Sequence, residues 1–258
     1  MFENELSAIA GGAKGKYTLL KKNPLGYFLL SMLAGMFIGF GVLLAFTAGS
    51  LTSETPFSKI IMGCCFGIAL SLVVIAGAEL FTGNNMVMAV GISRKTVNVK
   101  ESIILWIVCY LGNLAGSILL ALIFIGCGLA TGVTGDFIIN AASTKMSMAP
   151  LALICRGILC NMLVCLAVWS GFRCKSESGK LIMIFWCLLA FITTGFEHSI
   201  ANMTLLTVGV IADNFANLGG WFYNILLVTL GNMIGGIVFV AMPYLASTKK
   251  EKEISDLK

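Results

Sequence analysis

Six long apolar stretches, separated by short polar segments, account for most of the chain. Each reaches the roughly 20 residues that a helix needs to cross the hydrocarbon core of a membrane. The stretches centre on residues 25–46, 60–90, 102–130, 150–172, 181–210 and 221–244. The pattern predicts an all-α membrane protein with six transmembrane helices in one domain, residues 25–244. An amphipathic segment (residues 1–24) precedes this domain, and a polar tail (residues 245–258) follows it.

The second and fifth stretches are interrupted by polar residues at membrane depth. As one helix, the second stretch (residues 60–90) would be about 46 Å long, against a hydrocarbon core of about 30 Å. The interrupting residues of the two stretches are Glu79, Thr82, Asn84, Asn85, Glu197, His198, Ser199 and Asn202. Irregular backbone survives at this depth only where it is buried in protein or lines a water-filled path. We therefore expect helices 2 and 5 to be broken, and each break to present a half-helix N-terminus, which favours an anion.

The two interruptions resemble each other in sequence. Residues 77–84 read GAELFTGN and residues 195–202 read GFEHSIAN, so both follow the pattern G-x-E-x-x-x-[GA]-N. A second pair, LGNLAG at residues 111–116 and LGNMIG at residues 230–235, lies at an offset of 119 residues, against 118 for the first pair. Glycine-bearing breaks at matching places in two halves indicate a channel or transporter built from discontinuous helices.

The basic residues alternate along the chain. From the N-terminal segment through the five loops to the C-terminal tail, the counts of Lys and Arg are 4, 1, 3, 1, 3, 0 and 4. By the positive-inside rule, both termini and the loops 93–101 and 172–180 lie in the cytoplasm. Three spans per half then give the halves, about residues 25–130 and 150–244, opposite orientations. The sequence thus predicts an inverted 3+3 repeat in the cytoplasmic (inner) membrane. The basic clusters set topology, and no nucleic-acid partner is expected.

Composition agrees with this class and excludes others. The chain is 58% hydrophobic and 11% charged, whereas soluble domains carry about 25% charged residues. The nine Cys residues lie almost entirely in apolar stretches and form no C-x-x-C motif, so we interpret them as small hydrophobes. One His supplies too few ligands for a metal site. We expect no disulfide, metal or cofactor.

Ionisable residues inside membrane spans are rare and usually functional. His198 is the only His, and it is either a satisfied buried polar group or a pore-lining group whose protonation changes near neutral pH. We interpret Glu79 and Glu197, with Asn84 and Asn202, as bracing the breaks. In this interpretation the carboxylates accept freed backbone N–H groups; the alternative is that they touch the permeant species.

Two further basic residues lie near the expected path. Arg156, inside the fourth stretch, needs an acidic or carbonyl partner that the sequence does not identify. Lys145 ends an outer loop. Its spacing favours a solvated loop charge over a residue that attracts anions towards the pore mouth or His198.

At the two interruptions the chain resembles the formate/nitrite transporter family. AELFT at residues 78–82 and GFEHSIANM at residues 195–203 resemble the two signature loops of that family, and the resemblance extends to Tyr244. It implies an aquaporin-like fold of six helices per protomer and a homopentamer with one pore in each protomer. The implied substrates are small monovalent anions, including formate, nitrite and hydrosulfide.

The resemblance also implies positions along the pore. It places the pore-centre residues at His198, Thr82, Lys145 and Asn161. It places a cytoplasm-side constriction at Leu80 and Phe81, and an outer constriction at Phe66, Leu70 and Phe191. It therefore reverses the interpretation of Lys145 from spacing alone, and it gives Arg156 no role. The residues after AELFT are Gly83-Asn84-Asn85, which is closer to the nitrite and hydrosulfide branches, and we favour hydrosulfide.

We predict a gated, passive anion channel. The alternative within transport is a proton-coupled transporter that carries the anion as its neutral acid after protonation by His198. An intramembrane enzyme is disfavoured because the chain has one His and no G-x-S-x-G motif. A purely structural membrane protein would not need two repeat-related polar breaks.

Overall fold

The computed structural model describes residues 2–248, so most of the predicted tail, residues 245–258, lies outside the described residues. Between residues 2 and 248 the regular structure is helical, and no β-strand occurs there. Six stretches within these described residues are long and apolar enough to cross a membrane. The all-α fold with six spans, predicted from the hydrophobic pattern, is confirmed.

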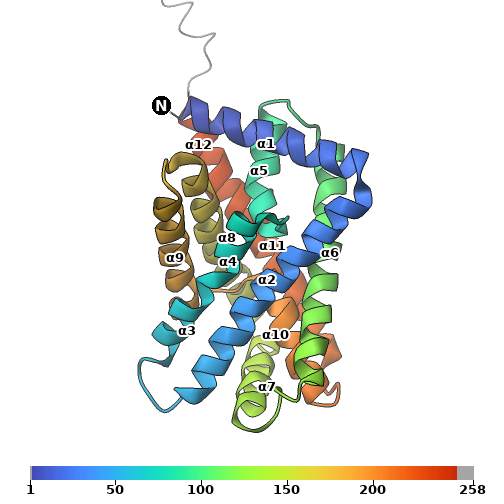
Figure 1. Ribbon diagram of the computed structural model, residues 1–258, viewed down its shortest axis with the longest axis vertical. Coiled ribbons are helices and arrows are strands. Elements are labelled where there is room, and N and C mark those ends of the chain that lie inside the picture. Colours follow the sequence, from blue (N-terminus) through green and yellow to red (C-terminus); the bar gives the residue numbers. More distant parts are fainter. Residues whose placement is uncertain (1, 249–258) are drawn as a thin grey trace, which may run out of the picture.

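The spans form an upright bundle, and helix α1 (Glu3–Lys22) lies across one end of it (Figure 1). They are α2 (Pro24–Leu51); α3, α4 and η1 (Ser58–Phe66, Ile68–Leu72 and Val73–Gly77); α6 (Val99–Gly126); α8 (Pro150–Arg173); α9 (Glu177–Thr194); and α11, η2 and α12 (Leu218–Gly236, Ile237–Ala241 and Met242–Ala246). Three shorter helices lie between the spans along the chain: α5 (Phe81–Ser93), α7 (Gly132–Met146) and α10 (Ser199–Ala212). Helices α5 and α10 are buried on nearly all sides, which puts them inside the bundle.

Local sequence signals set several helix boundaries. Asn98 and Glu101 form a capping box that starts α6. Gly77 (φ 81°) ends η1, and Gly195 (φ 77°) directly follows α9. Both glycines are in the left-handed region. A residue with a side chain is strained in that conformation, whereas Gly adopts it freely. The same residue type therefore stops the helix at the corresponding point of each interruption.

Two pairs of spans approach closely through glycines. A Cβ on Gly116 of α6 would collide with the backbone of Met32 in α2, and a Cβ on Gly235 of α11 would collide with the backbone of Ile158 in α8. In lipid no hydrophobic force drives helices together, so small residues that allow close van der Waals contact stabilise such pairs. These glycines therefore pack helices within one chain.

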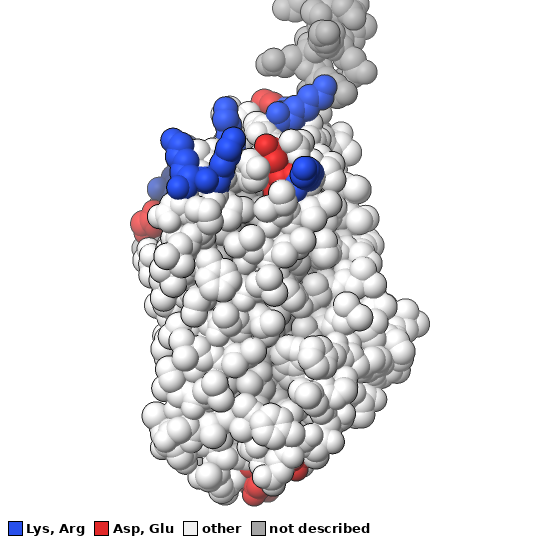
Figure 2. All heavy atoms as spheres, turned by 90° about the vertical axis from the view of Figure 1, so that its right-hand side faces the viewer, with Lys and Arg blue, Asp and Glu red and all other residues white. Residues whose placement is uncertain are grey.

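Basic residues gather at the end of the bundle that α1 covers. Glu3 of α1 pairs with Arg94 at 2.8 Å, and Glu5 of α1 lies 3.5 Å from Arg173. Figure 2 shows Lys and Arg side chains at this end, next to a broad region of that face without charged residues. The N-terminal segment and two of the basic loops thus share one end, as the positive-inside rule requires of them. Which side of the membrane this end faces stays a prediction.

Candidate functional site

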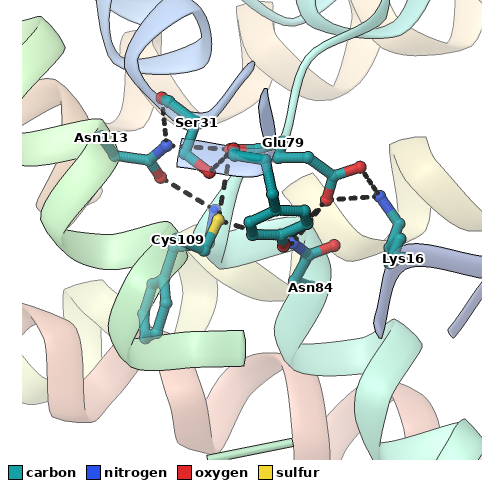
Figure 3. A network of polar contacts seen from close by, with 8 residues as sticks. Lys16, Ser31, Glu79, Asn84, Cys109 and Asn113 are labelled. Atoms are coloured by element: carbon teal, nitrogen blue, oxygen red, sulfur yellow. Dashed lines mark hydrogen bonds and ion pairs between the residues drawn. The ribbon is translucent and has the colours of Figure 1, made fainter. Parts of the chain in front are cut away.

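The first interruption consists of the extended residues Ala78–Leu80, between η1 and α5. The N–H of Phe81, freed at the start of α5, donates to Oδ1 of Asn113 at 2.9 Å. The Nδ2 of Asn113 donates to the carbonyls of Ser31 at 2.7 Å and Glu79 at 2.9 Å. One buried amide from α6 therefore binds the break on both sides and ties it to α2 (Figure 3).

The second interruption, residues 195–198, is held in the same way between α9 and α10. The N–H of Ser199 donates to Oδ1 of Asn232 at 2.9 Å. The Nδ2 of Asn232 donates to the carbonyls of Gly157 at 2.8 Å and Glu197 at 2.9 Å. Asn113 and Asn232 thus make corresponding contacts, and each satisfies one of the N–H groups that a helix start leaves unpaired.

The carboxylate of Glu79 lies in a network of side chains at the first break (Figure 3). Lys16 of α1 donates to both carboxylate oxygens, at 2.7 and 2.8 Å. Asn84 Nδ2 and the Tyr27 hydroxyl donate to Oε2 at 3.0 and 3.1 Å. The amphipathic helix thus supplies the counter-ion for a carboxylate that lies among transmembrane helices.

Glu197 has the same kinds of partner at the second break. Lys145 Nζ, in the last turn of α7, lies 2.5 Å from Glu197 Oε1, and Asn202 Nδ2 donates to Oε2 at 2.6 Å. Asn224 accepts from Asn202 at 2.8 Å and donates to the Lys145 carbonyl at 2.9 Å. The side chain of Glu197 is only 2% exposed, against 11% for Glu79, so the second pair is the more deeply buried.

These contacts differ from the expectation that the two glutamates accept freed backbone N–H groups. Asn113 and Asn232 accept them, because an amide offers one acceptor and two donor hydrogens at once, whereas a carboxylate only accepts. Glu79 and Glu197 instead bind Lys and Asn side chains. The repeated L-G-N-x-x-G segments carried the signal for Asn113 and Asn232, but the sequence pattern identified them only as markers of the repeat. Lys16 was counted only as a topology charge.

Two large cavities share lining residues with one small chamber in the described bundle. The first cavity, here the α7-side vestibule, has a volume of about 620 Å³ and is lined by residues that include Lys145 and His198. The second, here the α1-side vestibule, measures about 470 Å³ and is lined by residues that include Lys16 and Glu79. The chamber measures about 10 Å³. It is lined by Ile38, Phe66, Leu70, Leu80, Val164, Leu188, Phe191 and His198.

Shared lining residues place the chamber between the two vestibules. Phe66, Phe191 and His198 line both the chamber and the α7-side vestibule. Leu70 and Leu80 line both the chamber and the α1-side vestibule. The Phe66 and Phe191 rings meet edge to face, with centroids 5.3 Å apart. Two apolar barriers therefore close the chamber, one on each side.

Phe81 lies elsewhere than expected, whereas Leu70 lines the chamber with Phe66 and Phe191. Leu70 also lines the α1-side vestibule, with Leu80. Phe81 was expected beside Leu80. It is buried against Tyr110, with ring centroids 4.9 Å apart, and in the described part of the chain it lines neither the chamber nor a vestibule. Phe81 opens α5 immediately after Leu80, and successive residues on a helix diverge by about 100°.

His198 lies at the start of α10 with both ring nitrogens in contact. Its Nδ1 accepts the N–H of Ala201 at 3.1 Å, and its Nε2 lies 3.0 Å from Thr82 Oγ1. Because Nδ1 accepts a backbone donor, the proton of the neutral ring is on Nε2 and is donated to Thr82. The Thr82 hydroxyl then keeps its own proton for another acceptor.

Asn161 supports this centre from α8. Its Nδ2 donates to the Thr82 carbonyl at 3.2 Å and to the Asn232 carbonyl at 2.7 Å. Asn161 is fully buried and is not among the described residues that line the chamber. The structure thus brings Asn161, Thr82 and His198 together, with Asn161 binding backbone. Lys145 lines the α7-side vestibule, as His198 does, and its side chain donates to Glu197.

Arg156 has the carbonyl partner that its position required. Its Nη1 lies 3.4 Å from the Gly195 carbonyl in the second interruption, and its own carbonyl accepts the N–H of Glu197 at 3.2 Å. The side chain is exposed to the α7-side vestibule.

Known proteins share this architecture over nearly the whole chain. The nitrite transporter NirC of Salmonella typhimurium is 39% identical over 256 residues, which are 98% of this chain and 94% of that protein. A solved structure of an FNT family ion channel has a TM-score of 0.91 at 38% identity and covers 96% of this chain and 100% of that one. A pentameric formate channel with formate bound has a TM-score of 0.78 at 30% identity over 88% of this chain and 98% of that one.

These relatives are named transporters or channels, which supports the prediction that the chain is not an enzyme. The family model for the formate/nitrite transporter matches residues 5–246. This multi-pass membrane protein therefore belongs to the formate/nitrite transporter family.

Proposed function

We propose that the chain conducts small monovalent anions of weak acids through the chamber that separates its two vestibules. The observation that carries this proposal is the order of groups along the path. Two lysines line each vestibule, and two apolar barriers enclose a chamber beside His198. Fixed positive charge in a cleft raises the local concentration of anions. The apolar barriers make dehydration of an ion costly, so they exclude ions that hold water strongly.

The permeant anion must fit a very small space. The chamber, at about 10 Å³, has room for about one water molecule. Hydrosulfide has a single heavy atom, so it requires the least movement of Phe191 and Leu80, and we propose it as the favoured anion. Nitrite is the second candidate because the relative from Salmonella typhimurium is a nitrite transporter. Formate is the third, from the structurally similar formate channel.

We infer that the protein is an aquaporin-like inverted 3+3 repeat with broken helices 2 and 5. The corresponding contacts of Asn113 and Asn232, and of Glu79 and Glu197, support this inference. We also propose that both termini are cytoplasmic and that the membrane is the inner membrane. The alternation of basic residues along the sequence supports the orientation.

We propose a homopentamer with one pore per protomer. The similarity to a pentameric formate channel supports the assembly. Each chain also contains both vestibules and the chamber itself, so the proposed path does not need residues from a second copy.

We further propose that His198 binds the anion through its hydrogen-bond network and does not protonate it. Adding a proton at Nδ1 would break the bond from the Ala201 N–H and place two donors against each other. The hydrogen-bond geometry therefore favours the passive channel. The alternative is the proton-coupled transporter, in which His198 hands a proton to the anion.

His198→Asn separates these mechanisms in liposomes that contain the purified protein. Asn is a good N-cap and can accept the Ala201 N–H, but it cannot deliver a proton at neutral pH. We expect wild type to conduct hydrosulfide, nitrite and formate, and His198→Asn to keep at least about a third of the flux with altered pH dependence. Loss of flux in His198→Asn, with flux in wild type driven by the proton gradient, would support the proton-coupled alternative. A wild type that conducts none of the three anions would refute the proposed function.

Leu80→Ala and Phe191→Ala each remove one of the two barriers. Because the remaining barrier still dehydrates the ion, each single variant should conduct somewhat faster, and the double variant should also conduct larger anions such as lactate. We expect a rise in flux of roughly tenfold for the double variant, equivalent to about 1.4 kcal/mol of barrier. Stopped-flow flux in liposomes measures this.

Phe81→Ala is the control, because Phe81 is next to Leu80 in the chain but packs on Tyr110. Its selectivity should match wild type. If the double variant keeps wild-type selectivity, the narrow points of the path lie elsewhere.

A further inference from the structure

The α7-side vestibule has more positive charge than its ion pair accounts for. Its charged lining residues are Lys59, Lys145, Arg156 and Glu197. Glu197 pairs with Lys145. Within residues 2–248, neither Lys59 nor Arg156 forms an ion pair with an acidic residue. Arg156 lies at the second break, whereas Lys59 lies in the first turn of α3.

Arg156 occupies a place that the first break fills with an apolar residue. The N–H of Glu197 donates to the Arg156 carbonyl at 3.2 Å, and the N–H of Glu79 donates to the Leu30 carbonyl at 3.2 Å. Leu30 lines the α1-side vestibule as Arg156 lines the other. The backbone contact that holds each break therefore does not require a guanidinium. The side chain of Arg156 is available for a different role.

The guanidinium of Arg156 is nearly free to bind a ligand. Its one described hydrogen bond is the long contact of 3.4 Å to the Gly195 carbonyl, which leaves four of its five N–H donors without a partner in the described chain. A guanidinium presents parallel donors that match two oxygens of a planar anion, whereas an ammonium acts as a point charge. Nitrite and formate each have two such oxygens, and hydrosulfide has one acceptor atom.

We propose that Arg156 is a selectivity residue that binds planar two-oxygen anions at the α7-side vestibule before they enter the chamber. This inference rests on the proposed function. It makes the two faces of the channel unequal, because the α1-side vestibule has Leu30 at the corresponding place. The guanidinium should therefore lower the concentration at which nitrite and formate are captured from the Arg156 side. It should lower the corresponding concentration of hydrosulfide less.

Arg156→Lys is the informative variant because it keeps the charge and removes the parallel donors. Initial flux is measured in liposomes against the concentration of nitrite, formate and hydrosulfide on the Arg156 side. We expect the half-saturating concentration of nitrite and formate to rise roughly fivefold or more, because one charge-assisted hydrogen bond to the anion is lost. The value for hydrosulfide should change less than about twofold, and maximal rates should be kept.

Lys59→Gln is the matched control, since it removes one charge from the same vestibule without altering a break. It should weaken the binding of all three anions to a similar extent, and by less than Arg156→Lys weakens the binding of nitrite and formate. Arg156→Leu places the residue type of Leu30 at the second break. It should weaken the binding of all three anions, and that of nitrite and formate most. Equal changes for all three anions in Arg156→Lys, or none in Arg156→Leu, would overturn the inference.

A binding measurement separates this inference from the proposed function. Saturation-transfer NMR of the formate proton detects formate on detergent-solubilised protein whether or not the protein conducts. Formate binding that is weakened roughly fivefold or more in Arg156→Lys, and clearly less in Lys59→Gln, supports the inference even if liposome flux is absent. Formate binding that is unchanged in Arg156→Lys overturns it even if wild type conducts all three anions.

Discussion

Replacing Asn113 or Asn232 with alanine is expected to destabilise the protein by about 3–5 kcal/mol. Each amide makes three buried hydrogen bonds, and its loss strands the break N–H and carbonyl groups in the bundle interior. An unsatisfied buried polar group costs about 1–3 kcal/mol, and at least two would be left at each site. Thermal and denaturant unfolding of the detergent-solubilised protein measures the loss.

Asn217→Ala is the control for this prediction. Asn217 caps α11 at an exposed site, where its side chain accepts the Gly220 N–H at 2.8 Å. Removing such a cap costs typically about 1 kcal/mol. If Asn113→Ala and Asn232→Ala cost no more than Asn217→Ala, these amides do not hold the breaks.

Lys145→Met is expected to destabilise the protein by about 3–5 kcal/mol, because it leaves the buried charge of Glu197 without its partner. The double variant Lys145→Met with Glu197→Gln removes both charges and should recover most of the loss. The single variant should conduct anions slowly, because it removes the positive charge of Lys145 and leaves the negative charge of Glu197, whereas the double variant keeps the net charge of the pair and should conduct faster than the single variant. Unfolding and flux measured on the same preparations separate the two effects.

Lys16→Met is the comparison within the same chain. It also removes the cation from a glutamate, but the side chain of Glu79 is 11% exposed, against 2% for Glu197. Water stabilises a partly exposed carboxylate, so the loss should be smaller than for Lys145→Met. Equal losses at the two sites, or no recovery in the double variant, would contradict the idea that buried charge pairing sets the cost.

Much of the fold was predictable from the sequence because membrane insertion depends on properties that a short window contains. Length and apolar content identify a span, and the six stretches correspond to six spans in the structure. The repeated G-x-E-x-x-x-[GA]-N segment located the residues between η1 and α5 and between α9 and α10. The same segments carried the family resemblance, which the comparisons confirm.

The candidate site was only partly predictable, because its contacts join residues far apart in the chain. Lys16 and Glu79 are 63 positions apart, and no local pattern shows that an amphipathic helix supplies the counter-ion of a transmembrane carboxylate. His198 and Thr82 were both expected at the pore centre, and the structure places them 3.0 Å apart. Their contact depends on two half-helices meeting inside the bundle.

The sequence by itself determined the spans, the two interruptions, the family and the residues from which a path could be built. Tertiary structure decided which way those residues face. Phe81 and Leu80 are neighbours in the chain, yet one packs on Tyr110 and the other borders the chamber. The physical reason is that hydrophobicity and length act along the chain, whereas a pore is defined by side-chain directions, which packing between helices selects.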